Sequence, residues 1–542
     1  MIQQLLTKEF DLIVVGGGIT AAGILLDAQT RGINSILFEM QDFASGTSSR
    51  STKLIHGGLR YLKQLEFSLV AEVGKERKIV YQNGMHITRP ETMILPILKG
   101  GSINKIGAWF GLWLYDYLAK VAPHEKRIML NKSETLELEP LLHENSLLGG
   151  VKYYEYRTDD ARLTIELIKA AISHGANALN YFKVVGFIYD EDKKIRGVKV
   201  EDLETHQIYE VKSKHVVNAS GPWVDHIDQL ENKKLKNKII HTKGVHIVVD
   251  ITKLPIKNSL YFDAMDGRMI FAIPRESKVY IGTTDTQYQG NLEHPLITQE
   301  DRIYLLQAIN QQFKQVHLVE KDIESGWAGL RPLVKQKNNN NPTAISRKDE
   351  IFFLESGLVT IAGGKLTGYR KMAERTVDSI ASRLSAKGSI IKPCQTAIVK
   401  ISGGEFDNED EFQNFLKSKT NLGVELGISP KEASLLVYRY GKNISTIYGI
   451  HHRNTPEELQ KWKFPSILLA EIKYALEYEQ VLTPSDFFIR RTSALYFDID
   501  KVKKWKNTTN DFFGNYFGWS NATLEKNLSE LELQIAEAFA EY

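Results

Sequence analysis

The feature that most limits the fold is a glycine-rich turn between an apolar run and a helical pattern. Residues 10–15 read FDLIVV, and Gly16-Gly17-Gly18 follow them directly. Gly16, Gly18 and Ala21 meet the G-x-G-x-x-G/A spacing. Such glycines let a pyrophosphate approach main-chain N–H groups at a helix N-terminus, where the helix dipole favours negative charge. The order of strand, glycine turn and helix predicts a doubly wound α/β fold that binds a dinucleotide.

A second apolar run ends in an acidic residue at the spacing that ribose binding requires. Residues 35–38 read SILF, and Glu39 and Met40 follow. An acidic side chain about 20 residues after the glycines holds the ribose hydroxyls in such folds. An ordinary glycine-rich turn is the alternative, but strand, glycines, helix, strand and acid in register favour the dinucleotide site.

The next stretch is polar and punctuated by glycine. Residues 43–62 read FASGTSSRSTKLIHGGLRYL, which does not fit a core strand. Small residues permit close backbone approach, and hydroxyl groups supply adaptable hydrogen bonds. We therefore expect a loop that wraps a ligand.

Two later segments predict further contacts with the same ligand. Residues 215–219 read HVVNA, a strand that ends at Ser220 and Gly221. Residues 358–362 read LVTIA and precede a second glycine turn, GGKLTG at 363–368, with a helix from about Tyr369. The carboxyl ends of parallel strands meet at one sheet edge, so both segments can reach the cofactor there.

The remaining chain predicts two more domains. Residues 239–286 alternate as short antiparallel strands do, which suggests an inserted substrate domain. An aromatic-rich stretch at 103–121 favours a helix packed on the body over a membrane-surface helix, because its polar face lacks a basic excess. The expected domains are a discontinuous nucleotide-binding domain (1–90, 150–238 and 345–392), a substrate or cap domain (91–149 and 239–344) and a C-terminal α-helical domain (393–542).

Composition excludes several classes of function. The net charge is only +3 over 542 residues, and the basic residues are spread along the chain, so a nucleic-acid site is not expected. The single cysteine, Cys394, excludes an intrachain disulfide, a Cys-ligated iron–sulfur cluster and a CxxC redox pair, and it fits a reducing compartment. We expect no metal site, no signal peptide and no membrane-spanning segment.

Several motifs together carry a family resemblance. The chain resembles the FAD-dependent glycerol-3-phosphate dehydrogenases over roughly residues 1–390, and its helical C-terminal part fits the layout of that family. Ala21 and Ser220 stand where the family usually has Gly and Thr, and both are small enough to suit the turn. The matching motifs are GGGIT (16–20), DFASGTSSRSTKLIHGGLRYL (42–62), DDARL (159–163), NASGPW (218–223), GTTD (282–285), GLRPL (329–333) and GGKLTGYRKMAE (363–374).

The resemblance implies a fold and a reaction. The fold is a doubly wound Rossmann-like FAD domain with an antiparallel substrate-capping sheet and a C-terminal helical domain, α+β overall. The reaction is oxidation of sn-glycerol 3-phosphate to dihydroxyacetone phosphate, with hydride transfer to flavin N5. The dehydrogenases pass electrons to membrane quinone and the related oxidases to oxygen. We expect the quinone, with a peroxide-releasing oxidase as the alternative.

A quinone acceptor implies where the protein works. It implies a cytoplasmic enzyme held peripherally at the inner face of the cell membrane. The oligomeric state is left open, with a homodimer as one option.

The matching motifs also carry candidate catalytic residues. Arg60 and Arg331 each follow a glycine-containing turn, and their fork geometry suits the substrate phosphate or the developing oxygen charge. Tyr61 can add a hydroxyl contact. Lys365, at a helix N-terminus, suits either the anionic reduced flavin or the substrate.

The general base is one of two histidines. His56 and His246 both lie in motif-rich segments, and histidine has a suitable pKa for taking the hydroxyl proton. The choice between them stays open.

Two other functions remain open alternatives. One is an FAD-dependent amine or amino-acid oxidase on the same fold, and the other is a non-catalytic flavin-binding or membrane-docking module.

The resemblance further implies which residues hold FAD. They are Gly16, Gly18, Ile19, Thr20, Ala21, Glu39, Met40, Ser45, Thr47, Ser48, Ser49, Lys53, Leu54, His56, Gly57, Gly58, Ala219, Gly221, Gly364, Lys365, Leu366 and Thr367.

Overall fold

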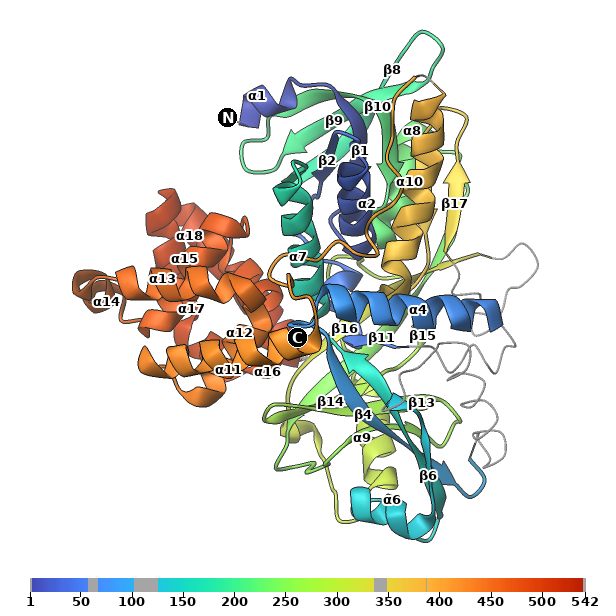
Figure 1. The fold of residues 1–542 in the computed structure, drawn as a ribbon, viewed down its shortest axis with the longest axis vertical. Coiled ribbons are helices and arrows are strands. Elements are labelled where there is room, and N and C mark those ends of the chain that lie inside the picture. Colours follow the sequence, from blue (N-terminus) through green and yellow to red (C-terminus); the bar gives the residue numbers. More distant parts are fainter. Residues whose placement is uncertain (1, 57–66, 102–124, 336–348, 387, 540–542) are drawn as a thin grey trace.

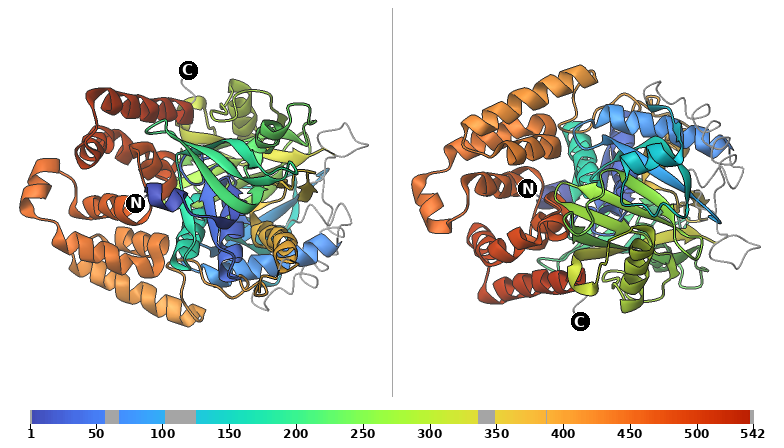
Figure 2. Two further views of the ribbon diagram at one scale, coloured as in Figure 1. Left: turned by 90° about the horizontal axis from the view of Figure 1, so that it is seen from above. Right: turned by 90° about the horizontal axis from the view of Figure 1, so that it is seen from below.

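The computed structural model describes residues 2–56, 67–101, 125–335, 349–386 and 388–539. Within them the chain forms two β-sheets, which lie one above the other in Figure 1, with a helical body beside them. The helical body lies along one side of the sheets in both views of Figure 2. This arrangement confirms the α/β fold class with a separate helical domain that the sequence predicts.

The upper sheet of Figure 1 follows the doubly wound pattern. Its central strands run parallel in the order β18-β10-β1-β2-β7, while β17 and the β8–β9 hairpin join it in antiparallel fashion. Its strands, among the described residues, are β1 (Phe10–Val15), β2 (Ser35–Phe38), β7 (Asn177–Leu179), β8 (Phe182–Tyr189), β9 (Ile195–Asp202), β10 (Ile208–Asn218), β17 (Glu350–Phe353) and β18 (Val359–Ala362).

Both faces of this sheet are covered, which explains the continuous apolar run of β1. Leu12 and Val14 pack against helices, while Ile13 and Val15 join the core under the β8–β9 hairpin, as the period of two requires. Asp159 caps α7 by accepting a hydrogen bond from the N–H of Arg162. The described helices of this body are α1 (Ile2–Leu6), α2 (Ile19–Thr30), α4 (Phe67–Asn83), α7 (Asp160–Ser173), α8 (Val224–Glu231) and α10 (Tyr369–Ser385).

The lower sheet is largely antiparallel, as the alternating pattern predicts. The exception is the parallel pairing of β12 with β4, where Leu260 lies beside Ile94. Among the described residues, α6 (Lys132–Leu138) and α9 (Gln299–Gln312) accompany it. Its described strands are β3 (Leu54–Ile55), β4 (Arg89–Leu98), β5 (Ile128–Leu130), β6 (Leu147–Arg157), β11 (Ile239–Asp250), β12 (Ser259–Asp263), β13 (Met269–Arg275), β14 (Lys278–Gly282), β15 (Thr286–Gln287) and β16 (Ile323–Val334).

The C-terminal body is helical, as expected. Some of its helices begin with an N-cap residue followed by proline, as Ser429 before Pro430 and Thr455 before Pro456 show. Its described elements are α11 (Glu409–Glu425), α12 (Pro430–Tyr440), η7 (Gly441–Asn443), α13 (Ile444–Arg453), α14 (Pro456–Trp462), α15 (Ser466–Tyr478), the π-helix η8 (Asp486–Arg491), α16 (Ala494–Phe497), α17 (Ile499–Phe517) and α18 (Asn521–Phe539).

The polar loop at 43–62 departs from expectation in one respect. It contains the short helix η1 (Thr47–Ser49) and the strand β3, which pairs with Arg157 and Tyr156 at the edge of the lower sheet. That pairing depends on residues a hundred positions away, so the loop's own composition carries no signal of it.

Some expectations are not addressed by the described residues. The aromatic stretch at 103–121 and the polar residues 338–341 lie outside them, and the domain boundaries stay a prediction. None of the described helices combines the length and the apolar character that crossing a bilayer demands.

Candidate active site

A cavity of about 1120 Å³ opens where the two sheets meet. Residues of both sheets line it, from the glycine turn after β1 to the middle of β11. The carboxyl edge of a doubly wound sheet is where ligands bind, and cavities of this size hold large cofactors. The candidate residues are therefore expected to line this cavity.

The glycine turn after β1 forms one end of the cavity. Gly16 has a φ of +111°, and a Cβ there would lie 2.7 Å from the carbonyl oxygen of Ala219. Only glycine fits, since both the backbone conformation and the space exclude a side chain. The turn at Gly16, here called the glycine cradle, therefore brings the main chains of β1 and β10 close together. A pyrophosphate requires such a turn in order to approach the main chain closely.

The N-terminus of α2 faces the same end. Its N-cap is Gly18, and the Ile19 N–H donates to Ser48 Oγ over 2.9 Å. Gly18, Ile19, Thr20 and Ser48 line the cavity together. A helix N-terminus beside a hydroxyl-rich loop suits an anionic group.

Glu39 lies at the end of β2, where the sequence predicts the ribose contact. Its carboxylate accepts hydrogen bonds from the N–H of Gly17 at 2.5 Å and of Gln41 at 2.9 Å. Burial raises the pKa of Glu39 to about 7, although these N–H groups act in the opposite direction. Glu39 and the following Met40 both line the cavity, so the carboxylate can accept from a ribose hydroxyl.

The polar loop lies along the cavity wall. The Ala44 N–H donates to the carbonyl of Gly17 over 3.0 Å, which ties the loop to the glycine turn. The Thr47 hydroxyl donates to the Leu330 carbonyl over 2.7 Å, which ties it to the lower sheet. Ser45, Thr47, Ser48, Leu54 and His56 all line the cavity.

Three of the expected cofactor-binding residues are placed elsewhere. Ala21 and Ser49 are buried and do not line the cavity. Lys53 is 1% exposed, and its ammonium donates to Asp160 Oδ1 at 2.6 Å and to the Ser49 carbonyl at 2.9 Å. The lysine holds the loop against α7, and its charge is already matched.

The other end of the cavity carries Arg331. Its guanidinium, on β16, donates to Asp285 Oδ1 and to Thr283 Oγ1, each at 3.0 Å. A Cβ on Gly244 would overlap the guanidinium of Arg331, so this glycine makes room for it. The carboxylate of Asp285 fixes the orientation of a cation that lines the cavity.

His246 lies two residues beyond Gly244 on β11, on the same face of the strand. Its ring stacks on Trp327 with centroids 4.9 Å apart, and Nε2 lies 3.1 Å from Thr52 Oγ1. Burial lowers the pKa of His246 well below its usual value, and the nearby charges of Arg331 and Lys53 act in the same direction. The imidazole is therefore neutral at physiological pH and lines the cavity.

The second glycine turn and the His56 segment meet at the cavity. The Thr367 hydroxyl donates to the His56 carbonyl over 3.1 Å, and Lys365 precedes the short helix η6 (Leu366–Gly368). His56, Lys365 and Thr367 line the cavity, as do Gly364 and Leu366.

Ala219 and Gly221 also line it, at the end of β10. Arg60, Tyr61, Gly57 and Gly58 lie outside the described residues.

Sequence reasoning gave no role to several residues that build the site. Asp285 and Thr283 lie in the GTTD motif, so a signal for them was available. Trp223, in the NASGPW motif, covers Gly46, where a Cβ would lie 3.1 Å from its ring. Trp327 belongs to none of the quoted motifs, and only the fold brings it against His246.

These residues fit FAD. The cradle at Gly16 excludes a side chain, α2 starts beside a hydroxyl-rich loop, and Glu39 stands at the ribose position. The cavity continues from there to Arg331, His246 and Lys365. An adenine dinucleotide at one end would therefore place its second ring system near these two cations and the neutral imidazole.

Comparison with protein families gives two matches. A family model described as FAD dependent oxidoreductase matches residues 11–370. A second, described as the C-terminal domain of alpha-glycerophosphate oxidase, matches residues 394–524.

Two curated relatives are similar over nearly the whole chain. An aerobic glycerol-3-phosphate dehydrogenase of Bacillus subtilis (strain 168) is 48% identical over 539 residues, 99% of this chain and 97% of that protein. A protein of the same name from Staphylococcus haemolyticus (strain JCSC1435) is 47% identical over 538 residues, 99% of this chain and 96% of that protein.

Solved structures show the same fold. The X-ray structure of the glycerol-3-phosphate dehydrogenase from Bacillus halodurans complexed with FAD has a TM-score of 0.86 and 44% identity, and covers 100% of this chain and 97% of that chain. The FAD-bound L-alpha-glycerophosphate oxidase from Mycoplasma pneumoniae has a TM-score of 0.54 at 16% identity, over 69% of this chain and 95% of that chain, which shows the fold alone.

Proposed function

The chain belongs to the family of FAD-dependent oxidoreductases, and on this premise we propose that it oxidises sn-glycerol 3-phosphate to dihydroxyacetone phosphate. The observation that carries the proposal is that one cavity joins the glycine cradle to Arg331 and His246. A phosphate-bearing alcohol needs such a cation and such a base at the far end of the cofactor. The names of the full-length relatives support this substrate.

FAD, when bound, supplies the acceptor of the hydride. The protein supplies binding and orientation. Arg331 binds the substrate phosphate, because a guanidinium held by Asp285 offers two N–H donors in a fixed plane. Lys365 adds positive charge beside the N-terminus of η6, where it stabilises negative charge that develops during the reaction.

We assign the general base to His246. The imidazole of His246 lies on the same face of β11 as Gly244. The guanidinium of Arg331 occupies the space that a side chain on Gly244 would need. Since burial keeps the imidazole neutral, one ring nitrogen can accept the hydroxyl proton of the substrate. The stack on Trp327 and the contact with Thr52 fix the ring plane. His56 is the alternative base.

A substrate comparison tests the proposal. The holoenzyme is assayed with an artificial electron-accepting dye and one of three substrates: glycerol 3-phosphate, glycerol or an amino acid. We expect turnover with glycerol 3-phosphate, far slower turnover with glycerol and none with amino acids. Faster turnover of amino acids would instead support an amino-acid oxidase.

The electron acceptor is proposed to be a quinone. The support is the family resemblance, together with the names of the full-length relatives, which call them dehydrogenases and not oxidases. In air and without dye or quinone, the enzyme should release almost no peroxide while glycerol 3-phosphate is present. Stoichiometric peroxide would identify an oxygen-using oxidase.

Membrane contact follows from a quinone acceptor. We propose peripheral attachment at the inner face of the cell membrane. The protein should sediment with native membranes at low salt and be released as the salt concentration rises, because exposed charge interactions are screened. Failure to sediment at low salt would remove this part of the proposal.

A further inference from the structure

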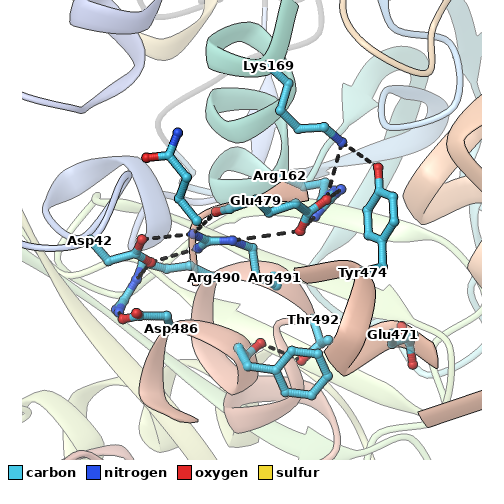
Figure 3. A network of polar contacts seen from close by, with 12 residues as sticks. Asp42, Arg162, Lys169, Glu471, Tyr474, Glu479, Asp486, Arg490, Arg491 and Thr492 are labelled. Carbon is cyan, nitrogen blue, oxygen red and sulfur yellow. Dashed lines mark hydrogen bonds and ion pairs between the residues drawn. The ribbon is translucent and has the colours of Figure 1, made fainter. Parts of the chain in front are cut away.

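Asp42 connects the polar loop to the C-terminal helical body through buried charges. The residue lies just after β2 and is 0% exposed. Its carboxylate accepts hydrogen bonds from Arg490 Nε at 2.5 Å and from Arg491 Nη1 and Nη2 at 2.7 and 2.8 Å (Figure 3). Burial would raise the pKa of Asp42, but the charges of the two arginines keep it below its usual value.

The two arginines are fixed from the C-terminal side. Arg490 Nη2 donates to Asp486 Oδ1 at 2.5 Å, and Arg491 Nη2 donates to the Glu479 carbonyl at 2.8 Å. Glu479 is itself paired with Arg162 of α7 over 2.8 Å (Figure 3). The clamp formed by Arg490 and Arg491 is thus part of a rigid buried network.

From Asp42 the chain passes straight into the cofactor cradle. Phe43 is buried in the core of the upper body, and the Ala44 N–H donates to the Gly17 carbonyl. Four residues later, Ser48 Oγ accepts from the Ile19 N–H at the start of α2. A shift of Asp42 would therefore move the groups that surround the pyrophosphate position.

A second contact holds the far end of the same loop. Ser493 Oγ donates to Asp159 Oδ2 at 2.6 Å, beside the Lys53–Asp160 pair. The Tyr496 ring lies 5.0 Å from that of Trp327, whose Nε1 donates to the Ser51 carbonyl at 3.1 Å. The Lys53 ammonium also lies 5.5 Å from the centre of the Tyr496 ring, so the C-terminal body contacts both ends of residues 42–54, here called the cofactor loop.

We propose that the C-terminal helical body holds the cofactor loop in its FAD-binding conformation, with Asp42, Arg490 and Arg491 as positioning residues. The physical reason is the high cost of a buried carboxylate whose partners are removed. Without the contacts from the arginines, the Asp42 carboxylate is stabilised by moving toward water. Such a movement pulls Ala44 away from Gly17. FAD binding is then weakened at a distance, by residues that do not line the cavity.

The test measures FAD affinity separately from stability. Arg491→Met removes the guanidinium that contacts Asp42 and keeps an apolar side chain, while Arg491→Lys keeps the positive charge. The control is Arg439→Met, because the partners of Arg439, the Glu471 carboxylate and the Thr492 carbonyl, both belong to the C-terminal body and not to the loop. For each variant, the FAD dissociation constant is measured by binding FAD to apoprotein, and the melting temperature is measured with and without FAD.

We expect Arg491→Met to raise the FAD dissociation constant by about tenfold or more, with Arg491→Lys in between and Arg439→Met unchanged. The melting-temperature gain that FAD confers should shrink only in the Arg491 variants. Equal FAD affinity in Arg491→Met and the control would overturn the proposal. None of these readouts depends on which substrate the enzyme oxidises.

A measurement on the unaltered holoenzyme covers the case in which Arg491→Met does not fold. Amide hydrogen exchange is followed for residues 43–49 and 486–491 as denaturant is raised, together with FAD release. The proposal predicts that both segments open together and that FAD leaves with them. Opening of residues 486–491 while residues 43–49 stay protected and FAD stays bound would contradict it.

Discussion

At the scale of single residues, the catalytic end of the cavity depends on glycines that make room for larger side chains. A Cβ on Gly244 would overlap Arg331, and a Cβ on Gly282 would overlap the ring of His246. Gly244 on β11 lies diagonally across from Arg331 on the paired strand β16, and Gly282 on β14 lies directly opposite His246 on β11. Because neither glycine carries a side chain, the guanidinium of Arg331 and the imidazole of His246 can lie close together.

The role of Arg331 gives a direct prediction. Arg331→Lys loses the planar fork and should raise the KM for glycerol 3-phosphate by about 10–100-fold, since hydrogen bonds to charged groups contribute about 1.5–3 kcal/mol. Steady-state kinetics check this, with Arg302→Lys on α9 as the control. A loss of the same size with glycerol would show that Arg331 does not act on the phosphate.

His86 predicts a dependence of stability on pH. The ring is fully buried, and neither of its nitrogens has a hydrogen-bond partner among the described residues. Burial, followed by the charges of Arg162, Lys169 and Arg89, lowers the pKa of His86 well below its usual value. The unfolded chain therefore binds a proton that the folded chain rejects, so stability should fall as the pH drops below about 6.5.

Denaturant unfolding at about pH 8 and about pH 5.5 measures this loss, which is at most about 1.4 kcal/mol per pH unit for one group. His86→Leu should reduce it, and His246 contributes with the same sign. An equal loss in the wild type and the variant would show that the pKa of His86 is the same in the folded and the unfolded chain.

Residue types and motifs predict much of the site, but not the pairings within it. The glycine spacing predicts Gly16 and Gly18 as cofactor contacts, and the position after the second apolar run predicts Glu39 as the ribose contact, because both signals are local. The ion pair of Lys53 with Asp160 joins residues far apart in the chain, and a local motif does not indicate such a pair. The motif made Lys53 an expected FAD contact, whereas the structure places it in this ion pair.

At the scale of elements, the turn between β1 and α2 is the most constrained. Gly16→Ala adds a Cβ 2.7 Å from the Ala219 carbonyl oxygen at a φ of +111°, so strain of about 1–3 kcal/mol adds to a steric clash. We expect this variant to purify without FAD, as judged from its visible absorbance. Gly32→Ala is the control, because Gly32 also has a positive φ, of +88°, but has open space around it. Equal FAD content in the two variants would contradict the cradle.

The cofactor loop gives a second prediction at this scale. Lys53→Met leaves Asp160 buried without its cation and should lower the free energy of unfolding by about 3–5 kcal/mol. The double variant with Asp160→Asn should lose less than the sum of the single variants, as denaturant unfolding would show. Additive losses would mean that the two side chains do not act as a pair.

At the scale of the whole molecule, the two sheets and the helical body each supply a part of one site. The upper sheet supplies the glycine cradle, and the lower sheet supplies Arg331 and His246. The sequence predicts the sheets, because period and turn signals are local. It does not predict that Arg490 and Arg491 reach back to Asp42, because no local pattern marks a contact across more than 400 residues.

The protein is proposed to oxidise glycerol 3-phosphate with FAD bound in this cavity. The most direct measurement is an anaerobic titration of the holoenzyme with glycerol 3-phosphate, followed by the visible absorbance of the flavin. We expect bleaching of that absorbance as substrate is added, and no bleaching with glycerol at the same concentrations. A flavin that stays oxidised with excess glycerol 3-phosphate would contradict it.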